Sequence, residues 1–207
     1  MPSSQRSSRM RSLTDPEIAS TIHNGKGRMP AFASITDQQT FSQASVWGVT
    51  QPACIVSGDL YDFLSFTDSE VGLICADVSG KGTSAALTMA NLQALAQRRL
   101  LLFDSANVRP APDAFVTALN RDISGRFGDS RHATLFYGEF DSKTQILRYV
   151  NAGHTPPLFI SADGQVTRLS DGDLPVACFP TRKFRNVGLW CRGAVQSSYT
   201  PTEFRMR

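Results

Sequence analysis

The sequence has no long apolar run. Hydrophobic residues make up 41% of the 207 positions, which is enough for a buried core. No stretch approaches the ~20 consecutive apolar residues that a membrane-spanning helix needs. The first residues, MPSSQRSSRMRSLTDPE, are basic and serine-rich, and they lack the apolar segment of a secretory signal. We therefore expect a cytoplasmic protein with no membrane partner.

Cysteine and histidine are scarce as well. The chain has four cysteines and three histidines. No two cysteines are spaced as in a C-x-x-C motif, and no histidine lies at the spacing of zinc ligands. This usage indicates free thiols in a reducing compartment.

The middle of the chain lacks an excess of positive charge. The net charge of +3 comes from the ends, because residues 1–12 hold three arginines and residues 181–207 hold six basic residues against Glu203. Residues 13–180 carry 12 basic and 17 acidic residues. A folded domain that binds nucleic acid normally shows a basic patch. We therefore expect no nucleic-acid partner for the core, although a basic tail can bind polyanions without specificity.

The N-terminal residues lack a haem-attachment motif, although one segment resembles a cytochrome. Residues 1–14 are rich in serine and arginine and predict disorder. Residues 15–40, with the stretch HNGKGRMPAF, resemble the C-terminal part of class I cytochromes c, in which a methionine at the position of Met29 ligates iron. Because C-x-x-C-H occurs nowhere, covalent haem is excluded. We interpret residues 1–42 as an extension or linker.

From about residue 41 the sequence shows the pattern of a mixed helix and strand domain. Apolar runs and alternating apolar residues predict strands. Segments rich in alanine and leucine, or apolar residues spaced four positions apart, predict helices. The expected strands are 44–49, 70–78, 132–141, 145–154, 156–161 and 165–169, and the expected helices are 83–103 and 111–127. Because the two helices follow one another with no strand between them, this order favours an antiparallel sheet with helices packed on it.

A glycine-rich turn in residues 75–87, CADVSGKGTSAAL, connects a buried strand to a helix. Its first position is cysteine and its lysine is followed by glycine, so it fails the Walker A pattern. The segment GKGTSA does match the dinucleotide pattern G-x-G-x-x-A. However, the next helix leads to another helix, and Asp77 would place negative charge beside a bound pyrophosphate. We expect neither kind of nucleotide site.

Acidic residues near this turn favour a metal site instead. Asp77 ends the buried strand, and Asp59 and Asp62 precede it in the segment SGDLYDF. Carboxylates on adjacent strands can share hard cations such as Mg²⁺ or Mn²⁺, which prefer oxygen ligands. The structural alternative makes Asp59 and Asp62 turn residues and Asp77 the cap of the next helix. The residue types alone leave both readings open.

Four ordered motifs resemble one family. SGDLYDF, ADVSGKGTSAALTMA, ATLFYGEFD and YVNAGHTPPL occur in the order and spacing of the SpoIIE/RsbU-like branch of PPM-type (protein phosphatase type 2C-like) Ser/Thr phosphatases. The similarity covers residues 43–180. It implies an α+β fold, in which a β-sandwich is flanked by helices. It also implies a pair of Mn²⁺ or Mg²⁺ ions at one end, which activates water for attack on phosphoserine or phosphothreonine.

The resemblance also implies which residues form the metal site. Asp77 matches the aspartate that bridges both metals, and Val78 matches the carbonyl ligand beside it. Asp59 matches the acidic residue of the first motif, and Asp62 is expected in the outer shell. These assignments come from the family pattern, not from spacing.

Other residues of the motifs receive weaker expectations. Asn151 and His154 match the N-A-G-H turn, and we expect them to support the site without ligating metal. His132 matches no family role, and Lys81 is expected to be a solvated turn residue. The implied partner is a phosphorylated regulatory protein such as an anti-sigma-factor antagonist, and the oligomeric state is left open.

The C-terminal residues depart from the family pattern. After residue 180 the family continues into G-D-x-L-x-L-Y-T-D-G and ends in a further acidic motif, whereas residues 181–207 are basic and lack both. Reading the codons of residues 196–207 one base earlier admits VVLYTDGV, the missing motif. We therefore hypothesise a frameshift between Pro180 and Gln196. It predicts missing C-terminal strands, two lost metal ligands and little phosphatase activity, with a catalytically dead, partner-binding remnant as the alternative.

Overall fold

The structure, a computed structural model, describes residues 37–41, 44–50, 58–105, 109–124, 126, 131–161, 165–191, 193–197 and 202–206. The chain divides into two units, residues 1–34 and 35–207, and every described residue belongs to the second unit. Met29 and the rest of the cytochrome-like segment before residue 37 lie outside the described residues. The assignment of residues 1–42 to an extension or linker stays a prediction for residues 1–36, but it is wrong for residues 37–41, which form a strand of the second unit paired with residues 44–48.

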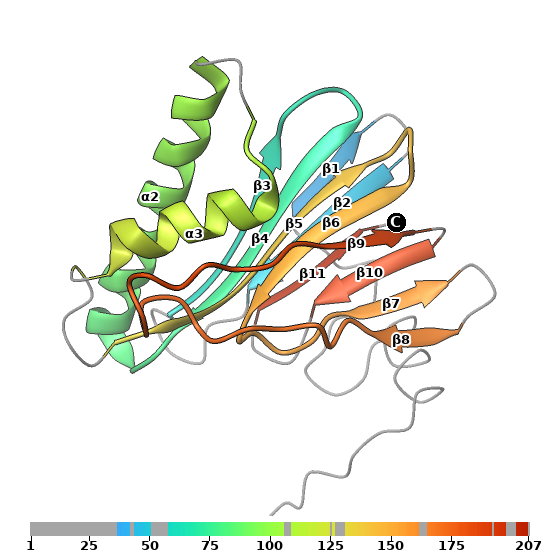
Figure 1. The fold of residues 1–207 in the computed structure, drawn as a ribbon. Helices are drawn as coiled ribbons and strands as arrows, with labels where there is room; N and C mark the ends of the chain where they lie inside the picture. Colours follow the sequence, from blue (N-terminus) through green and yellow to red (C-terminus); the bar gives the residue numbers. More distant parts are fainter. Residues whose placement is uncertain are drawn as a thin grey trace, which may run out of the picture. The chain divides into compact units, whose positions relative to one another are not determined.

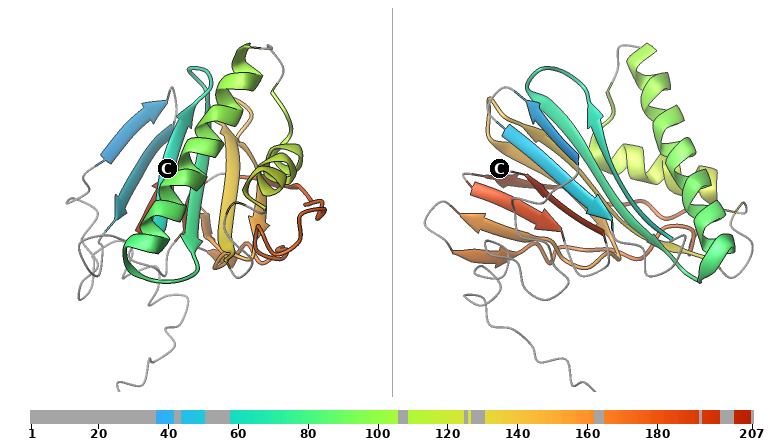
Figure 2. Two further views of the ribbon diagram at one scale, coloured as in Figure 1. Left: turned by 90° about the vertical axis from the view of Figure 1, so that its left-hand side faces the viewer. Right: turned by 180° about the vertical axis from the view of Figure 1, so that it is seen from behind.

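Two antiparallel sheets lie face to face in this unit (Figures 1 and 2). The six-stranded sheet has the order β1-β2-β11-β10-β7-β8, and the five-stranded sheet has the order β3-β4-β5-β6-β9. The strands of the first sheet are β1 (Asp37–Phe41), β2 (Ala44–Thr50), β7 (Leu158–Ser161), β8 (Val166–Arg168), β10 (Gly193–Ser197) and β11 (Thr202–Met206). The strands of the second are β3 (Asp59–Ser65), β4 (Glu70–Val78), β5 (Ala133–Asp141), β6 (Ile146–Ala152) and β9 (Val187–Trp190).

Two helices cover the outer face of the five-stranded sheet (Figure 1). They are α2 (Gly82–Ser105) and α3 (Pro112–Ile123). Proline suits the first turn of α3 because its fixed φ is already helical, and α3 buries residues at four-residue spacing along one face. The consecutive helices and antiparallel sheets confirm the expected α+β sandwich. No helix among the described residues combines the length and apolarity needed to cross a bilayer.

The five-stranded sheet has an apolar core on each of its faces. Ile74 and Ala76 of β4 belong to the cluster that packs against the helices. Leu73 and Cys75 belong to the cluster between the two sheets, against which Phe159 of β7 packs. Successive side chains of a strand point to opposite faces, so a strand buried on both faces is apolar at nearly every position. This is why residues 70–78 form a continuous apolar run.

The C-terminal residues form strands, which corrects part of the sequence prediction. We expected the C-terminal strands to be missing, but β9 pairs with β6, β10 pairs with β7, and β11 pairs with both β10 and β2. Strand pairing uses backbone N–H and C=O groups, which every residue except proline carries. A change of side chains in this segment therefore does not by itself remove the strands.

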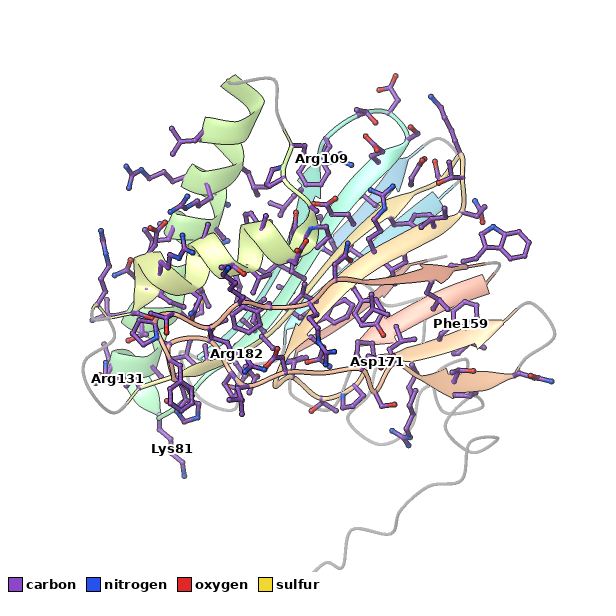
Figure 3. All side chains as sticks on the ribbon, in the orientation of Figure 1. Lys81, Arg109, Arg131, Phe159, Asp171 and Arg182 are labelled. Carbon is purple, nitrogen blue, oxygen red and sulfur yellow. The ribbon has the colours of Figure 1, made fainter. Side chains whose placement is uncertain are left out.

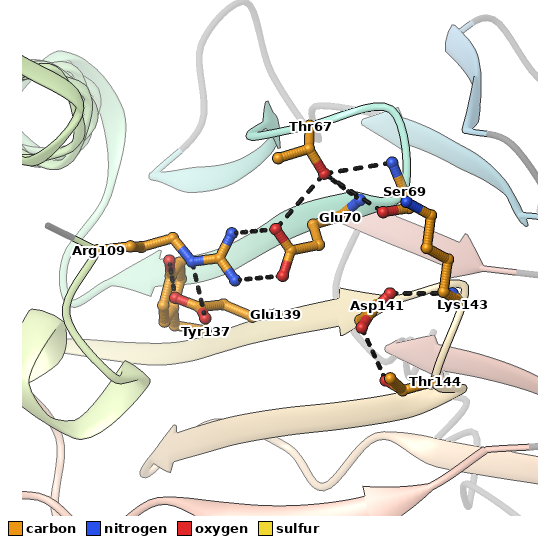
Figure 4. Close-up of polar contacts among 9 residues, drawn as sticks. All are labelled: Thr67, Ser69, Glu70, Arg109, Tyr137, Glu139, Asp141, Lys143 and Thr144. Carbon is orange, nitrogen blue, oxygen red and sulfur yellow. Dashed lines mark hydrogen bonds and ion pairs between the residues drawn. The ribbon is translucent and has the colours of Figure 1, made fainter. Parts of the chain in front are cut away.

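A polar network ties the segment before α3 to the sheet (Figure 4). Arg109 donates hydrogen bonds of 2.9 and 3.0 Å to the carboxylate of Glu70, and its Nε lies 3.6 Å from Glu139. Tyr137 donates a 2.8 Å hydrogen bond to Glu139. Burial raises the pKa of Glu139, although Tyr137 and Arg109 oppose this shift. The guanidinium also lies 4.6 Å above the ring of Phe66, so the network combines charge and packing.

The loop after β8 is held by one buried asparagine of α3. The Asn120 Oδ1 accepts a 2.8 Å hydrogen bond from the Ala177 N–H, and its Nδ2 donates to the Phe179 carbonyl at 2.9 Å. Asn120 is fully buried. Ala177 adopts φ +68°, a left-handed conformation that is strained for alanine. A backbone bridge between Val176 and Ala133 places this loop beside the start of β5.

Candidate functional site

Two carboxylates face each other at one end of the five-stranded sheet. Asp59, at the start of β3, is in register with Asp77 near the end of β4. Directly opposed residues of antiparallel strands share a face and have neighbouring side chains. Asp59 is only 9% exposed. The pKa of Asp77 is raised, first by its burial and second by the negative charge of Asp59, so the pair favours a bound cation.

This pair lies at the end of the core between the two sheets. Cys75 of β4 packs in the inter-sheet cluster, and so does Tyr61 of β3. Asp77 and Asp59 each lie two residues from these positions, and residues two apart on a strand point to the same face. The carboxylates are therefore on the sandwich side of the sheet and not beneath the helices.

Asp62 lies on the opposite face of β3. Its carboxylate accepts hydrogen bonds from Gln93 at 3.2 Å and from Gln97 at 2.9 Å, both on α2. The expectation that Asp62 belongs to the outer shell of the metal site is therefore wrong. Its three-residue separation from Asp59 reverses the direction of the side chain, and Asp62 instead anchors the helix to the sheet.

The backbone at Val78 lies close to Gly58. A Cβ placed at Gly58 would lie 3.0 Å from the Val78 oxygen. The Val78 N–H donates to the Gly58 carbonyl at 3.2 Å, so the two segments are fixed together. Gly80 and Gly82 have φ of +115° and +67°, which glycine adopts without a steric penalty, and they turn the chain into α2.

The donors present fit a hard divalent cation. Asp59, Asp77 and the Val78 carbonyl all offer oxygen, which Mg²⁺ and Mn²⁺ prefer, and such ions are commonly bound by one or two carboxylates with waters. Within the described residues, no group of three or more acidic, histidine or cysteine side chains gathers around one point. The described part of the chain thus brings together two carboxylates that could bind such a cation.

A threonine–histidine pair continues the row of residues beside Asp77. Thr134 of β5 is in register with Asp77, and its Oγ1 lies 2.9 Å from Nδ1 of His154. Burial lowers the pKa of His154 to about 4, so the imidazole is neutral at pH 7. His154 is therefore a neutral hydrogen-bonding group next to the carboxylates.

The N-A-G-H turn holds this histidine in place. The Asn151 Oδ1 accepts from the His154 N–H at 2.8 Å, and its Nδ2 donates to the His154 carbonyl at 3.0 Å. Gly153 has φ +73°, and a Cβ there would come within 2.7 Å of Pro175. The turn therefore needs both the asparagine and the glycine, and the expectation that Asn151 and His154 support the site stays a prediction.

Two neighbouring residues at the same end were not assigned a role from sequence. His132 donates its N–H to the Ser79 Oγ at 3.1 Å and accepts from the Ser79 N–H at 2.9 Å. Arg131 donates to Thr88 Oγ1 at 3.0 Å and to the Ser84 Oγ. The signal available in the sequence was two polar residues directly before the buried strand β5, a position that loops often use for function.

The glycine turn does not form a nucleotide site. Every ladder in the described sheets is antiparallel, whereas a dinucleotide fold needs parallel strands joined through a helix. Lys81 is exposed at the turn, as expected, and points away from the sheet (Figure 3). The antiparallel ladders of the described residues thus lack the parallel arrangement that a dinucleotide fold needs.

A hollow of about 910 Å³ opens at the other end of the five-stranded sheet. Its lining includes Phe66, Leu101, Arg109 and Glu139. The β3–β4 register places Ser65 opposite Val71, the far end from the carboxylate pair. Arg109 and Glu139 already bind each other there, so the hollow contains none of the predicted metal ligands.

Comparison with known sequences gives a consistent family. Residues 67–189 match the family described as Stage II sporulation protein E (SpoIIE). The chain is 29% identical over 160 residues to phosphoserine phosphatase RsbP of Bacillus subtilis, covering 75% of this chain and 38% of RsbP. It is 28% identical over 116 residues to phosphoserine phosphatase RsbU of B. subtilis, covering 56% and 32%. The chain thus spans about a third of the length of these relatives.

Comparison with solved structures gives the same fold. A Mycobacterium tuberculosis structure of RsbU and RsbW domains aligns with TM-score 0.61 and 22% identity over 79% of this chain and 44% of that one. The PP2C phosphatase domain of B. subtilis SpoIIE aligns with TM-score 0.62 and 17% identity over 77% and 46%. RsbX in complex with magnesium aligns with TM-score 0.63 and 11% identity over 82% and 98%. At these identities the likeness establishes the fold.

Proposed function

The chain belongs to the SpoIIE family of PPM-type phosphatase domains, and from this membership we propose that it is a metal-dependent protein-serine/threonine phosphatase. The observation that carries the proposal is the opposed pair of Asp59 and Asp77 at the end of the inter-sheet core. The proposed substrate is a phosphoserine or phosphothreonine on a cytoplasmic regulatory protein, such as an anti-sigma-factor antagonist. Two similar proteins are named phosphoserine phosphatases, which supports this substrate class.

In the proposed site, Asp59, Asp77 and the Val78 carbonyl would hold Mn²⁺ or Mg²⁺. A bound ion of this kind lowers the pKa of water in its coordination shell and neutralises charge on a phosphoryl group. The protein's part is to hold the ligands rigidly. The β3–β4 ladder fixes both carboxylates, and the Gly58 contact fixes the backbone at Val78. His154 stays neutral and hydrogen-bonded to Thr134, so it adds no competing positive charge at pH 7.

The proposal is tested by Mn²⁺-dependent hydrolysis of p-nitrophenyl phosphate and of a phosphoserine peptide. Asp77→Asn should lower turnover at least about a hundredfold, because it removes a charged metal ligand. Asp68→Asn is the matched control, since Asp68 is exposed in the turn between β3 and β4 and should leave turnover unchanged. A parent chain with no metal-dependent hydrolysis of either compound would contradict the catalytic proposal.

A second candidate function is binding without turnover. It is favoured by one observation, that the described residues supply only two carboxylates. The family match also ends at residue 189, close to where we propose that the reading frame changes. Under this alternative the chain binds phosphorylated partners but hydrolyses them poorly. Isothermal titration calorimetry with Mn²⁺, together with an activity assay, distinguishes the two candidate functions. Two bound ions with turnover favour the enzyme, and one weakly bound ion without turnover favours the binding module.

A further inference from the structure

Arg131 carries a positive charge that no described residue neutralises. Its guanidinium donates to Thr88 Oγ1 at 3.0 Å and to the Ser84 Oγ, both in the first two turns of α2. Arginine has five N–H donors, so three are left without a hydrogen-bond partner among the described residues. None of the ion pairs formed within the described residues includes it. The charge is therefore fixed in place yet available to a ligand.

The hydroxyl partners of Arg131 are themselves well ordered. Thr88 is 8% exposed, and its Oγ1 donates to the Ser84 carbonyl at 3.0 Å while accepting from Arg131. A guanidinium held by two hydroxyls of one helix loses much of its side-chain freedom in the free protein. A ligand that binds it then has less conformational entropy to remove.

Arg131 lies at the end of the sheet that carries the carboxylate pair. It directly precedes His132, whose backbone forms two hydrogen bonds with Ser79. Ser79 follows Asp77 by two residues, and Ser84 lies in the first turn of α2. Figure 3 shows Arg131 and Lys81 at the end of the molecule where α2 begins. Arg131 thus lies at the same end of the sheet as the candidate metal site.

Other anchored arginines of the fold are held differently. Arg99 lies 2.6 Å from Asp122, Arg109 lies 2.9 Å from Glu70, and Arg182 lies 2.6 Å from Asp173. Each of these charges is compensated within the protein by a carboxylate. Arg131 is held by neutral hydroxyls instead, which fix the guanidinium without cancelling its charge.

We propose that Arg131 binds an anionic group of the phosphoprotein substrate and thereby helps to determine specificity. This inference rests on the proposed phosphoprotein substrate. A guanidinium binds phosphate or carboxylate oxygens through paired, charge-assisted N–H···O bonds. The anion is either the phosphoryl group itself or an acidic side chain next to it in the substrate, and both present the same oxyanion chemistry.

The test is a binding measurement that needs no turnover. Fluorescence anisotropy is recorded with two labelled phosphoserine peptides, one with glutamates flanking the phosphoserine and one with alanines, and with their unphosphorylated forms. The variants are Arg131→Gln, Arg131→Lys and, as the matched control, Arg182→Gln, whose charge is already paired with Asp173. Circular dichroism confirms that each variant is folded. The Ser84→Ala variant keeps Arg131 but removes one of its supports.

Arg131→Gln should weaken phosphopeptide binding about tenfold, as expected for losing a charge-assisted hydrogen bond. It should also reduce the dependence of the dissociation constant on salt, because one ionic contact is lost. Arg131→Lys should recover part of the affinity, Ser84→Ala should lose a smaller part, and Arg182→Gln should bind like the parent. If Arg131→Gln weakens the binding of both phosphopeptides equally, the anion that Arg131 binds is the phosphoryl group. If it weakens only the binding of the glutamate peptide, the anion is the flanking acidic side chain.

Two results would overturn the inference. If the parent binds phosphopeptides and Arg131→Gln binds them equally well, or no worse than Arg182→Gln does, Arg131 has no such role while the proposed function stands. If the parent does not distinguish phosphorylated from unphosphorylated peptides, the proposed function itself fails, and this inference fails with it. A purely structural Arg131 would change the melting temperature but not the salt dependence of binding.

Discussion

Asp77 combines properties that serve binding at the expense of stability. Its pKa is raised by burial and by the charge of Asp59, although His132 opposes this shift, so ionising Asp77 is unfavourable in the folded protein. A carboxyl group with a raised folded-state pKa costs stability as pH rises above its unfolded value. The cost is relieved when a cation binds the folded state only.

We predict that Asp77→Asn stabilises the metal-free protein. In the presence of a chelator at pH 7, the substitution should raise the free energy of unfolding by about 1 kcal/mol, because it removes one of two adjacent negative charges. Thermal melts in chelator at pH 7 and pH 4 measure the effect, which should shrink at pH 4 as the carboxyl group protonates. Asp68→Asn, at an exposed position, should show no such change, and an unchanged or lower melting temperature for Asp77→Asn would refute the prediction.

His154 makes stability depend on pH in the opposite direction. Its folded-state pKa is about 4, below the ordinary value of about 6.5. The unfolded chain therefore binds a proton in this interval that the folded protein does not. The stability contributed by the neutral imidazole is fully present above pH 6.5 and is lost as the pH falls toward 4.

We predict that this group accounts for much of the acid sensitivity of the fold. Between pH 6.5 and pH 4 the parent should lose up to about 3 kcal/mol of unfolding free energy through His154. His154→Gln keeps a polar side chain but does not titrate. Its free energy of unfolding should therefore fall less steeply between pH 6.5 and pH 4 than that of the parent. Urea unfolding at several pH values measures it, and identical slopes for parent and variant would contradict the assignment.

At the scale of the elements, the sequence predicted most segments but not their contacts. The expected strand 70–78 is β4 as observed, and the expected helix 83–103 is α2 within two residues at each end. The helix predicted over 111–127 ends at Ile123, because Ser124 turns to an extended conformation with ψ 128°. The Ser124 N–H still makes the last helical bond to the Asn120 carbonyl, and its Oγ donates to the same carbonyl.

The register of Asp59 with Asp77 could not be read from the sequence. Hydrophobic alternation tells which residues of a strand share a face, but not which strand lies beside which. The family resemblance supplied the assignment of these two aspartates, and the β3–β4 ladder places them together. The wrong placement of Asp62 has another cause, because its three-residue separation from Asp59 already implies the opposite face of a strand. Only its helix partners, which are 31 and 35 residues away, could not be read from the sequence.

The contact between α3 and the loop after β8 gives a prediction at this scale. Asn120→Ala should lower the free energy of unfolding by about 2–3 kcal/mol, because it removes a fully buried side chain together with its hydrogen bonds to the Ala177 N–H and the Phe179 carbonyl. Urea unfolding measures the loss. Thr117→Ala is a useful control, since Thr117 accepts only one longer bond, 3.2 Å, from the Phe184 N–H. A loss of unfolding free energy no larger than that of Thr117→Ala would show that the hydrogen bonds of Asn120 to the loop are not needed for stability.

At the scale of the whole molecule, the C-terminal residues separate fold from activity. Residues 187–206 supply strands to both sheets, yet the proposed metal site draws only two carboxylates from the described residues. Backbone pairing tolerates a change of side chains, whereas a metal site depends on the identity and charge of each ligand. A frameshift in this region would therefore damage chemistry more than architecture.

We predict that restoring the alternative reading frame from about residue 196 onward raises activity. The restored chain should bind a second Mn²⁺ ion and hydrolyse p-nitrophenyl phosphate at least about a hundredfold faster, because added carboxylates increase metal affinity. Titration calorimetry and steady-state kinetics measure both effects, and Asp77→Asn in the restored chain is the inactive control. Equal activity of the two chains, or Pro201 and Thr202 codons that cannot yield GAC across their boundary, would rule out the frameshift.

The alternation of β3 has a consequence for how this strand can change over evolutionary time. Asp59 faces the space between the sheets, opposite Asp77. Asp62, three residues later, faces the helix α2. Slipping the strand by one position would send each to the wrong side, so both contacts would be lost in a single step. Substitutions between these positions change one contact at a time. Residues between these two positions can therefore be substituted, whereas an insertion or deletion between them would disrupt both contacts.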